Sequence, residues 1–275
     1  MTAVLQRARS IGLAVLTLAV TPWAAAGSAA RVPLDLSLAR VIDLTHPLDE
    51  RTIFWPTEKR TFELERLHFG PTPGGFFYAA NRFCTLEHGG THLDAPVHFG
   101  EGRRSVEQIP ADQLVAPAVV IDVVAEAAAD RDYRLSRADV ESWEREHGRI
   151  PAGAIVLLRT GWSERWPDRL RYLGDDTPGD ASKLHFPAFG ADAAELLVRE
   201  RRVGALGLDT ASLDHGPSRD FPVHRLAAAA EVPGLENLTG LAELPATGAW
   251  IVALPTKITG GSGAPLRAIA LLPAP

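Results

Sequence analysis

Three histidines and one aspartate lie close together in a single short segment. Residues 87–98 read Glu-His-Gly-Gly-Thr-His-Leu-Asp-Ala-Pro-Val-His, and the four side chains of interest are His88, His92, Asp94 and His98. Although a His-x-x-x-His spacing would suit one face of a helix, Gly89-Gly90 and Pro96 argue against a helix here. In an extended chain, even-numbered residues point to the same side. The parity therefore predicts that all four side chains share one face of a strand.

The distances along such a strand require a bend. At about 3.3 Å per residue, His92 and Asp94 would lie about 7 Å apart, close enough to converge on one ion. By the same rise, His88 would lie about 13 Å from His92 in a straight chain, which is too far. Gly89-Gly90 allow the chain to kink. We therefore expect a kinked strand that folds His88 back towards His92 and Asp94.

Two neutral imidazoles and a carboxylate suit zinc or manganese, and three protein ligands leave room for a water molecule. A structural zinc site usually has a fourth ligand, commonly a cysteine. We interpret His98, beyond the turn at Pro96, as an acid/base beside the bound water and not as a ligand. The alternative is that these histidines only satisfy hydrogen bonds in the core. The shared face and the glycines at the bend favour the metal site.

The elements that must position this segment alternate between buried strands and helices. Apolar runs predict strands at residues 41–45, 118–124, 154–158, 203–208, 250–254 and 267–272. Helices are expected at 136–147, with Ser136 as N-cap and Gly148 as stop, and at 190–202. The prolines and glycines of residues 49–82 predict loops. This alternation predicts an α/β fold in one domain, with no clear boundary after residue 31.

Composition limits the possible partners. The 275 residues carry a net charge of −6 and show no block of basic residues. Nucleic acid is therefore not expected as a partner, since phosphate binding needs clustered Lys and Arg.

The first thirty residues differ from the rest. Arg7 and Arg9 precede the apolar run 11–20, and small residues follow to Ala30. This order predicts a signal peptide at residues 1–30 and an exported, periplasmic chain of residues 31–275 that is free of the membrane after cleavage. The alternative is a membrane anchor, but the apolar run is shorter than the ~20 residues that span a bilayer.

Cys84 is the only cysteine, so no internal disulfide can form. It lies four residues before His88, which makes a nucleophile or ligand conceivable. Because an unpaired cysteine is usually buried, we expect a buried structural thiol.

Residues 88–99 match the His-x-Gly-Thr-His-x-Asp-x-Pro-x-His-Phe pattern, and the chain resembles the cyclase family, which includes bacterial kynurenine formamidases and isatin hydrolases. Further similar segments are Asp43-Leu-Thr-His-Pro47, Leu158-Arg-Thr-Gly-Trp162, Leu235-Glu-Asn-Leu238 and Lys257-Ile-Thr-Gly-Gly-Ser-Gly263. The resemblance covers roughly residues 38–272. It implies a single mixed β/β/α domain of the swivelling, cyclase-like type, and homodimers or homotetramers whose N-terminal segments exchange.

The resemblance also implies roles for particular residues. A metal would be bound by His88, His92 and Asp94, with His98 moving protons. A second metal, as in the formamidase-type members, would use His224 and Glu236, with Asp94 bridging; isatin-hydrolase-like members work with one manganese. The resemblance further places Trp55 and Ser212 at the substrate, whereas an ordinary core Trp is an equal alternative for Trp55. Asp209, Asp214 and His215 are expected to organise their loop and not to bind metal.

Together these features predict a metal-dependent hydrolase of a non-peptide C–N bond. A bound metal polarises the carbonyl and acidifies water, and a histidine can return a proton to the leaving nitrogen. The expected cofactor is Zn²⁺, as one or two ions, with Mn²⁺ as the alternative. The expected substrate is a small aromatic amide, either an N-formylkynurenine-type aryl formamide or a cyclic aryl amide such as isatin. Two other functions stay open: an exported metal-binding protein without catalysis, and hydrolysis or dehydration of an oxygen-containing ring.

Overall fold

The two most apolar runs of the sequence form neighbouring parallel strands, β5 (Val115–Asp122) and β7 (Ile155–Arg159). Successive side chains of a strand point to opposite faces. Val120 and Leu157 therefore lie in one hydrophobic core, while Val119 and Val156 lie in another. Strands that are apolar on both faces must be covered on both sides, which accounts for a hydrophobic core on each face of this sheet.

A computed structural model describes residues 38–59 and 61–273 of the chain. The other strands within them are β1 (Arg40–Asp43), β2 (Glu63–Pro71), β3 (Phe77–Cys84), β4 (His92–Asp94), β6 (Arg134–Leu135), β8 (Ala188–Phe189), β9 (Ala205–Leu208), β10 (Gly234–Glu236), β11 (Thr247–Pro255) and β12 (Gly263–Leu272). The α-helices are α1 (Val124–Ala129), α2 (Arg137–His147), α3 (Arg169–Leu173), α4 (Ala191–Glu195) and α5 (Pro222–Ala229). Shorter 3₁₀ turns lie at Pro96–His98, Val106–Gln108, Ala111–Gln113, Trp162–Arg165 and Leu241–Glu243, and a π-helical stretch at Leu196–Arg201 follows α4.

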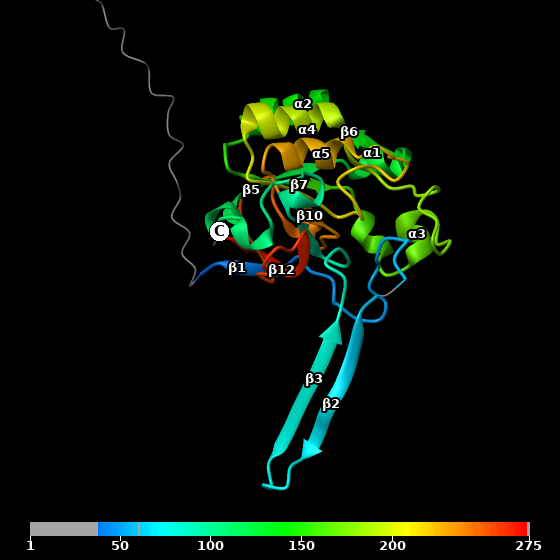
Figure 1. Ribbon diagram of the computed structural model, residues 1–275. Coiled ribbons are helices and arrows are strands. Elements are labelled where there is room, and N and C mark those ends of the chain that lie inside the picture. Colours follow the sequence, from blue (N-terminus) through cyan, green and yellow to red (C-terminus); the bar gives the residue numbers. More distant parts are fainter. Residues whose placement is uncertain (1–37, 60, 274–275) are drawn as a thin grey trace, which may run out of the picture. The chain divides into compact units, whose positions relative to one another are not determined.

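Seven of these strands close into a mixed barrel. Their order is β12-β11-β5-β7-β9-β10-β4, and β4 pairs again with β12, while β1 adds to the outer edge of β12. The strands β5, β7, β9 and β10 are parallel, and the remaining pairs are antiparallel. One hydrophobic core fills the barrel. The expected mixed α/β fold is confirmed (Figure 1).

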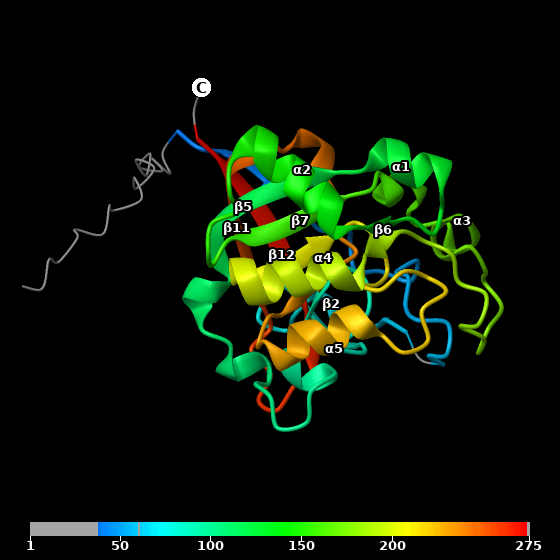
Figure 2. The ribbon, with the colours of Figure 1, turned by 90° about the horizontal axis from the view of Figure 1, so that it is seen from above.

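Helices α2, α4 and α5 cover the outer face of β5, β7 and β9 (Figure 2). Their apolar sides form the second core with that face, through residues such as Val140 in α2 and Val223 in α5. Ser136 caps α2 as expected, because its side chain accepts a hydrogen bond from the backbone NH of Asp139, and Gly148 ends the helix at φ +87°. The expected helix at 190–202 is also present, although its second half is π-helical.

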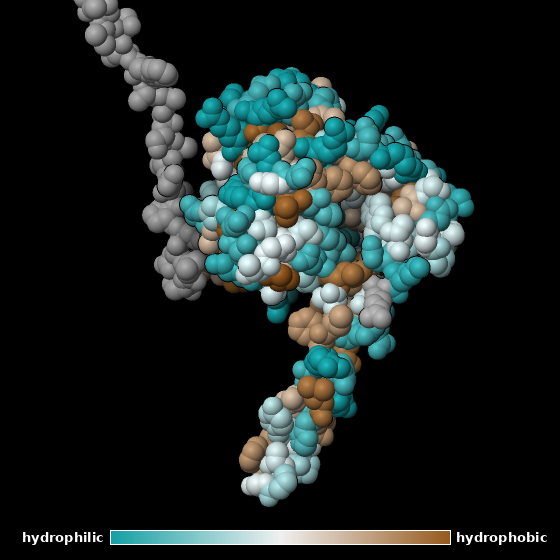
Figure 3. Space-filling view, viewed as in Figure 1, coloured by the Kyte–Doolittle hydropathy of each residue, from teal (hydrophilic) through white to brown (hydrophobic). Residues whose placement is uncertain are grey.

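The prediction of loops across residues 49–82 is wrong from residue 63 onwards. Strands β2 and β3 form an antiparallel hairpin that projects from the barrel, and the Pro- and Gly-rich residues 72–76 are only its turn (Figure 1). Most hairpin residues are exposed on both faces, so the alternation that reveals a strand is missing from the sequence. Apolar side chains lie along its surface (Figure 3).

The expectation for Cys84 is also wrong, because this residue is exposed at the end of β3. The reason is the same: its strand has no core to enter. The predicted signal peptide at residues 1–30 lies outside the described residues, and the domain boundary at residue 31 stays a prediction. Within residues 38–59 and 61–273, no helix combines the length and the hydrophobicity needed to cross a membrane.

Candidate active site

Asp94 lies at the centre of a group of imidazoles and carboxylates. It ends β4, which pairs with β10 on one side and β12 on the other. Glycines face Asp94 on both neighbours, Gly234 on β10 and Gly263 on β12. These positions carry no side chain, so the space around the carboxylate is left for other residues.

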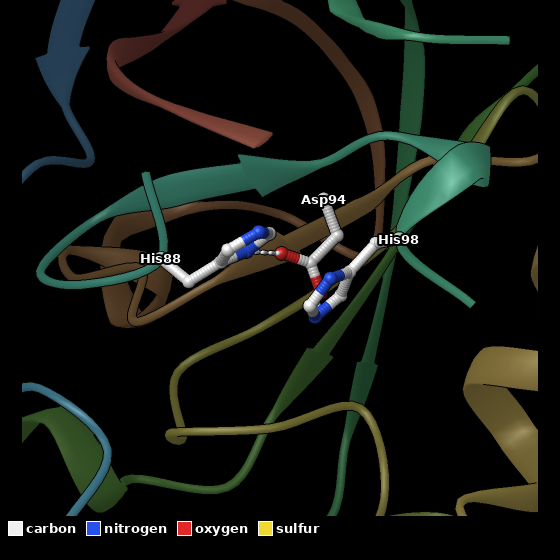
Figure 4. A group of neighbouring side chains, drawn as sticks. All are labelled: His88, Asp94 and His98. Carbon is white, nitrogen blue, oxygen red and sulfur yellow. Dashed lines mark hydrogen bonds and ion pairs between the residues drawn. The ribbon is translucent and has the colours of Figure 1, made fainter. Parts of the chain in front are cut away.

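The predicted bend is present. Gly90 has φ +60°, a conformation that glycine adopts without steric cost. A Cβ on Gly89 would lie 2.0 Å from the ring of Phe54, so that position also requires glycine. The bend brings His88 Nδ1 to 2.6 Å from Asp94 Oδ1 (Figure 4).

Strand register places Glu236 beside His92, because the two residues are directly opposed on β10 and β4. Their side chains approach to 3.6 Å, and His92 Nε2 lies 3.2 Å from Asp94 Oδ1. On the other side of its ring, His92 Nδ1 donates to the carbonyl oxygen of Gly90 at 2.9 Å. The bend at Gly90 therefore also orients His92.

His224 reaches the same group from α5. Its Nε2 lies 3.2 Å from Asp94 Oδ2 and 3.1 Å from Glu236 Oε1. Asp214 accepts hydrogen bonds from the ring Nδ1 of His224 at 2.6 Å and from the backbone NH groups of Val223 and His224. The carboxylate thus caps α5 and orients His224, which agrees with the expected organising role of Asp214.

The structure therefore brings the five predicted metal ligands together, and their chemistry fits a cation. His92 and His224 each donate through Nδ1 to an outer acceptor, so a neutral ring presents a lone pair at Nε2. Both lone pairs face the carboxylates of Asp94 and Glu236. Such a group of acceptors is stable only with a positive charge among them. Two sets have ligand atoms within 4.8 Å of one another: His88, Asp94 and His98, and His92, Asp94 and Glu236.

The pKa values show the strength of this field. Burial would raise the pKa of Asp94, but the imidazoles of His224, His88 and His92 hold it well below its usual range. Burial would lower the pKa of His92, yet Asp94 and Glu236 outweigh it and raise that pKa to about 9. Burial would also lower the pKa of His224. Asp214, Asp94 and Glu236 outweigh this effect and raise that pKa well above its usual value. The carboxylates attract positive charge strongly enough to overcome the cost of burial.

His98 differs from these three histidines. It ends the 3₁₀ turn at Pro96–His98, and its ring stacks on His88 with centroids 3.8 Å apart (Figure 4). Its Nε2 lies 4.0 Å from Asp94 Oδ2. Burial lowers the pKa of His98 to about 4, which Asp94 only partly offsets. The ring is therefore neutral at pH 7 and able to accept a proton.

The group opens into a cavity of about 510 Å³. Trp55 and Ser212, the two predicted substrate contacts, both line it. The ring of Trp55 packs edge-on against that of Phe186, with centroids 6.5 Å apart, and its centroid lies 6.4 Å from that of Phe221. The other apolar residues of the lining are Ile53, Phe54, Leu86, Phe99, Leu173 and Ala211.

Three contributing residues were not identified from the sequence. Asn237 Nδ2 donates to the same Gly90 oxygen as His92, at 2.8 Å, and Glu87 and Ser262 contact each other beside His88. Glu87 precedes the first histidine, and Ser262 lies in the Gly-Gly-Ser-Gly segment, but neither position indicates the contact.

Comparison with known proteins agrees with this geometry. The family model described as putative cyclase matches residues 42–215. Isatin hydrolase of Roseibium aggregatum is 38% identical over 207 residues, covering 72% of this chain and 77% of that protein. Kynurenine formamidase of Salinibacter ruber is 29% identical over 229 residues, covering 83% and 96%.

A solved structure extends the likeness to three dimensions. Isatin hydrolase A from Ralstonia solanacearum superposes with a TM-score of 0.76 at 38% identity, covering 86% of this chain and 93% of its own. The family model, the relatives and the fold all agree. The chain belongs to the cyclase family.

Proposed function

We propose that this protein is a metal-dependent hydrolase of aryl amide C–N bonds. The observation that carries the proposal is a buried group of acceptors, centred on Asp94, that lies beside the neutral His98 at the wall of an apolar cavity. Relatives called isatin hydrolase and kynurenine formamidase support the same reaction class.

The residues divide into ligands and a proton carrier. His88, His92 and Asp94 would hold one ion, and Asp94, His224 and Glu236 would hold a second. A bound ion supplies polarisation of the carbonyl and a more acidic water. His98 accepts the proton of the attacking water at Nε2 as the new C–O bond forms. It then returns that proton to the nitrogen as the C–N bond breaks.

The donor set supports zinc, as one or two ions, with manganese as the alternative. Imidazole and carboxylate ligands are compatible with both metals, and the set contains no thiolate that would exclude manganese.

The cavity favours an uncharged aromatic substrate. Among the described residues that line it, none is Lys or Arg, whereas Glu58 and Glu87 are carboxylates. A formamide of the N-formylkynurenine type carries a zwitterionic amino-acid group, and this lining offers no Lys or Arg to pair with its carboxylate. A cyclic aryl amide of the isatin type carries no such charge. Within aryl amides, we therefore propose that the cyclic class is the better substrate.

A substrate panel tests the proposal. Metal-stripped protein is reloaded with zinc or manganese and assayed on isatin, an aryl formamide and an aliphatic lactam. We expect hydrolysis of the aryl amides only with metal, and a loss of kcat of about 10²–10⁴-fold in His98→Ala. His147→Ala, at the end of α2, is the matched control. Metal binding with no turnover of any substrate would instead support a non-catalytic metal-binding protein. Turnover of substrates with an oxygen-containing ring alone would support hydrolysis or dehydration of such rings.

We also propose export and self-association. The composition of residues 1–30 supports cleavage by a signal peptidase, which mass spectrometry of the secreted chain would test. A two-stranded hairpin is only marginally stable alone, and β2–β3 exposes large apolar side chains such as Leu64, Phe69 and Phe83. These features support a homodimer or homotetramer in which the hairpin is covered by a second copy.

A further inference from the structure

His88 is held at both ring nitrogens. Its Nδ1 lies 2.6 Å from Asp94 Oδ1, and its Nε2 lies 2.9 Å from the hydroxyl oxygen of Ser262. The Ser262 hydroxyl in turn donates to Glu87 Oε2 at 2.6 Å. A chain of contacts therefore runs from Asp94 through His88 and Ser262 to Glu87.

The position of each proton in this series of hydrogen bonds follows from the chemistry of the groups. A carboxylate can only accept, so the single hydroxyl proton of Ser262 is committed to Glu87. The backbone NH of Ser262 donates to the same oxygen, at 3.0 Å, which fixes that oxygen as an acceptor. Ser262 can then only accept from His88, whose proton must lie on Nε2. The lone pair of the neutral ring is left on Nδ1, which faces Asp94.

We propose that Ser262, held by Glu87, is a positioning residue that fixes the proton of His88 on Nε2 and presents Nδ1 to the metal. This inference rests on the proposed metal site but assigns a role to residues outside the ligand set. Outer hydrogen bonds of this kind orient metal-binding histidines and fix their tautomer.

The surrounding backbone leaves His88 and Ser262 little freedom. The carbonyl oxygen of Ser262 accepts from the backbone NH of Ala95 at 2.8 Å, next to Asp94. A Cβ on Gly263 would lie 2.5 Å from His88 Cε1 and 2.6 Å from the carbonyl oxygen of Leu93. The ring of His88 thus fits against bare backbone, and the hydroxyl stands at a fixed distance from its outer nitrogen.

Two matched pairs of variants separate this role from general packing. Ser262→Ala removes the hydroxyl, whereas Ser262→Thr keeps it. Glu87→Ala removes the acceptor and frees the Ser262 proton to point at His88, whereas Glu87→Gln keeps an acceptor oxygen. If one variant of a pair does not fold, the other pair still decides.

Three measurements apply to each variant. The zinc dissociation constant is obtained by competition with a chromophoric chelator, and the melting temperature is measured on metal-free protein. The imidazole ¹⁵N spectrum of zinc-loaded protein shows which nitrogen of His88 carries a proton, with His88→Gln as the assignment control. We expect Ser262→Ala and Glu87→Ala to weaken zinc binding about 10–100-fold. Their metal-free melting temperatures should change little, and the Nε2 proton of His88 should lose its protection from exchange with solvent. Ser262→Thr and Glu87→Gln should keep that protection and most of the affinity.

Failure of the positioning role and failure of the proposed function would give different results. Unchanged zinc affinity in Ser262→Ala and Glu87→Ala, or equal losses in Ser262→Thr and Glu87→Gln, would overturn the positioning role while the proposed function stands. A wild-type protein that binds no zinc or manganese would overturn both.

Discussion

Asp94 illustrates how individual residues define this site, because one buried carboxylate contacts three imidazoles that come from different parts of the chain. His88 and His92 lie in the same segment, and His224 comes from α5. Burial opposes charge in Asp94, His92 and His224, yet the pKa of Asp94 stays low and those of His92 and His224 rise. His98 lies farther from Asp94, at 4.0 Å, and stays neutral. The same segment therefore holds histidines suited to binding a cation and one suited to moving a proton.

His46 offers a test of burial without a compensating charge. Its ring stacks on Trp166 at 4.3 Å, and its Nε2 has no hydrogen-bond partner. Burial lowers the pKa of His46 from 6.5 to about 4. Because the folded-state pKa lies below the unfolded one, the unfolded chain binds more protons between pH 6.5 and pH 4. Stability from this residue is full above pH 6.5 and falls as the pH drops towards 4.

We therefore expect His46→Phe, which keeps the stacking ring, to be less sensitive to acid. Between pH 7 and pH 4.5, metal-free wild type should lose about 2–3 kcal/mol more free energy of unfolding than the variant. Urea unfolding at both pH values measures the difference, and the other titrating groups cancel between the two proteins. Equal losses would show that His46 is protonated in the folded state.

At the level of the elements, strand pairing creates a contact in the site that the sequence does not reveal. The two glycines correctly predicted the bend that brings His88 to Asp94. The shared strand face holds only for His92 and Asp94, because His98 lies in a 3₁₀ turn. The position of Glu236 opposite His92 depends on the pairing of β4 with β10, and the two paired residues are 144 positions apart in the sequence (236 − 92). A three-residue strand has too little periodicity to predict such a pairing. His224 and Glu236 were accordingly reached only through the family resemblance.

The loop prediction for the β2–β3 hairpin failed for the opposite reason, since its strands are long but have no buried face. Their sequence shows prolines, glycines and scattered aromatics, which are typical of loops. A two-stranded hairpin without a core of its own is only marginally stable unless another surface covers it. Its exposed side chains therefore predict an interface.

We expect the wild-type protein to be a dimer or tetramer by light scattering, and Phe69→Ser with Phe77→Ser to shift it to a monomer. These two rings form an edge-to-face pair 5.1 Å apart, and each is about 60% exposed. Removing them takes away apolar area that association would bury. Leu170→Ser, an exposed leucine on α3, is the matched control. A monomeric wild type would contradict the assignment of the hairpin.

For the molecule as a whole, the site joins two strands of the barrel to a helix of the layer that covers it. β4 and β10 belong to the barrel where it closes, and α5 belongs to the layer that covers it. Without a cation, their facing carboxylates and lone pairs are compensated only by taking up protons. A bound ion would link all three elements, so metal binding should stabilise the fold and not only the active site.

Removing the metal should therefore lower the free energy of unfolding. At a free metal concentration of 100 times the dissociation constant, binding to the folded state alone contributes about 2.7 kcal/mol. Chemical unfolding of chelator-treated and reloaded protein should show this difference in wild type and in His147→Ala. It should nearly vanish in His92→Ala, because that variant lacks a ligand between Asp94 and Glu236. A stabilisation that persists in His92→Ala would place the ion elsewhere on the chain, and one that is absent from wild type would show that the buried acceptors hold protons instead.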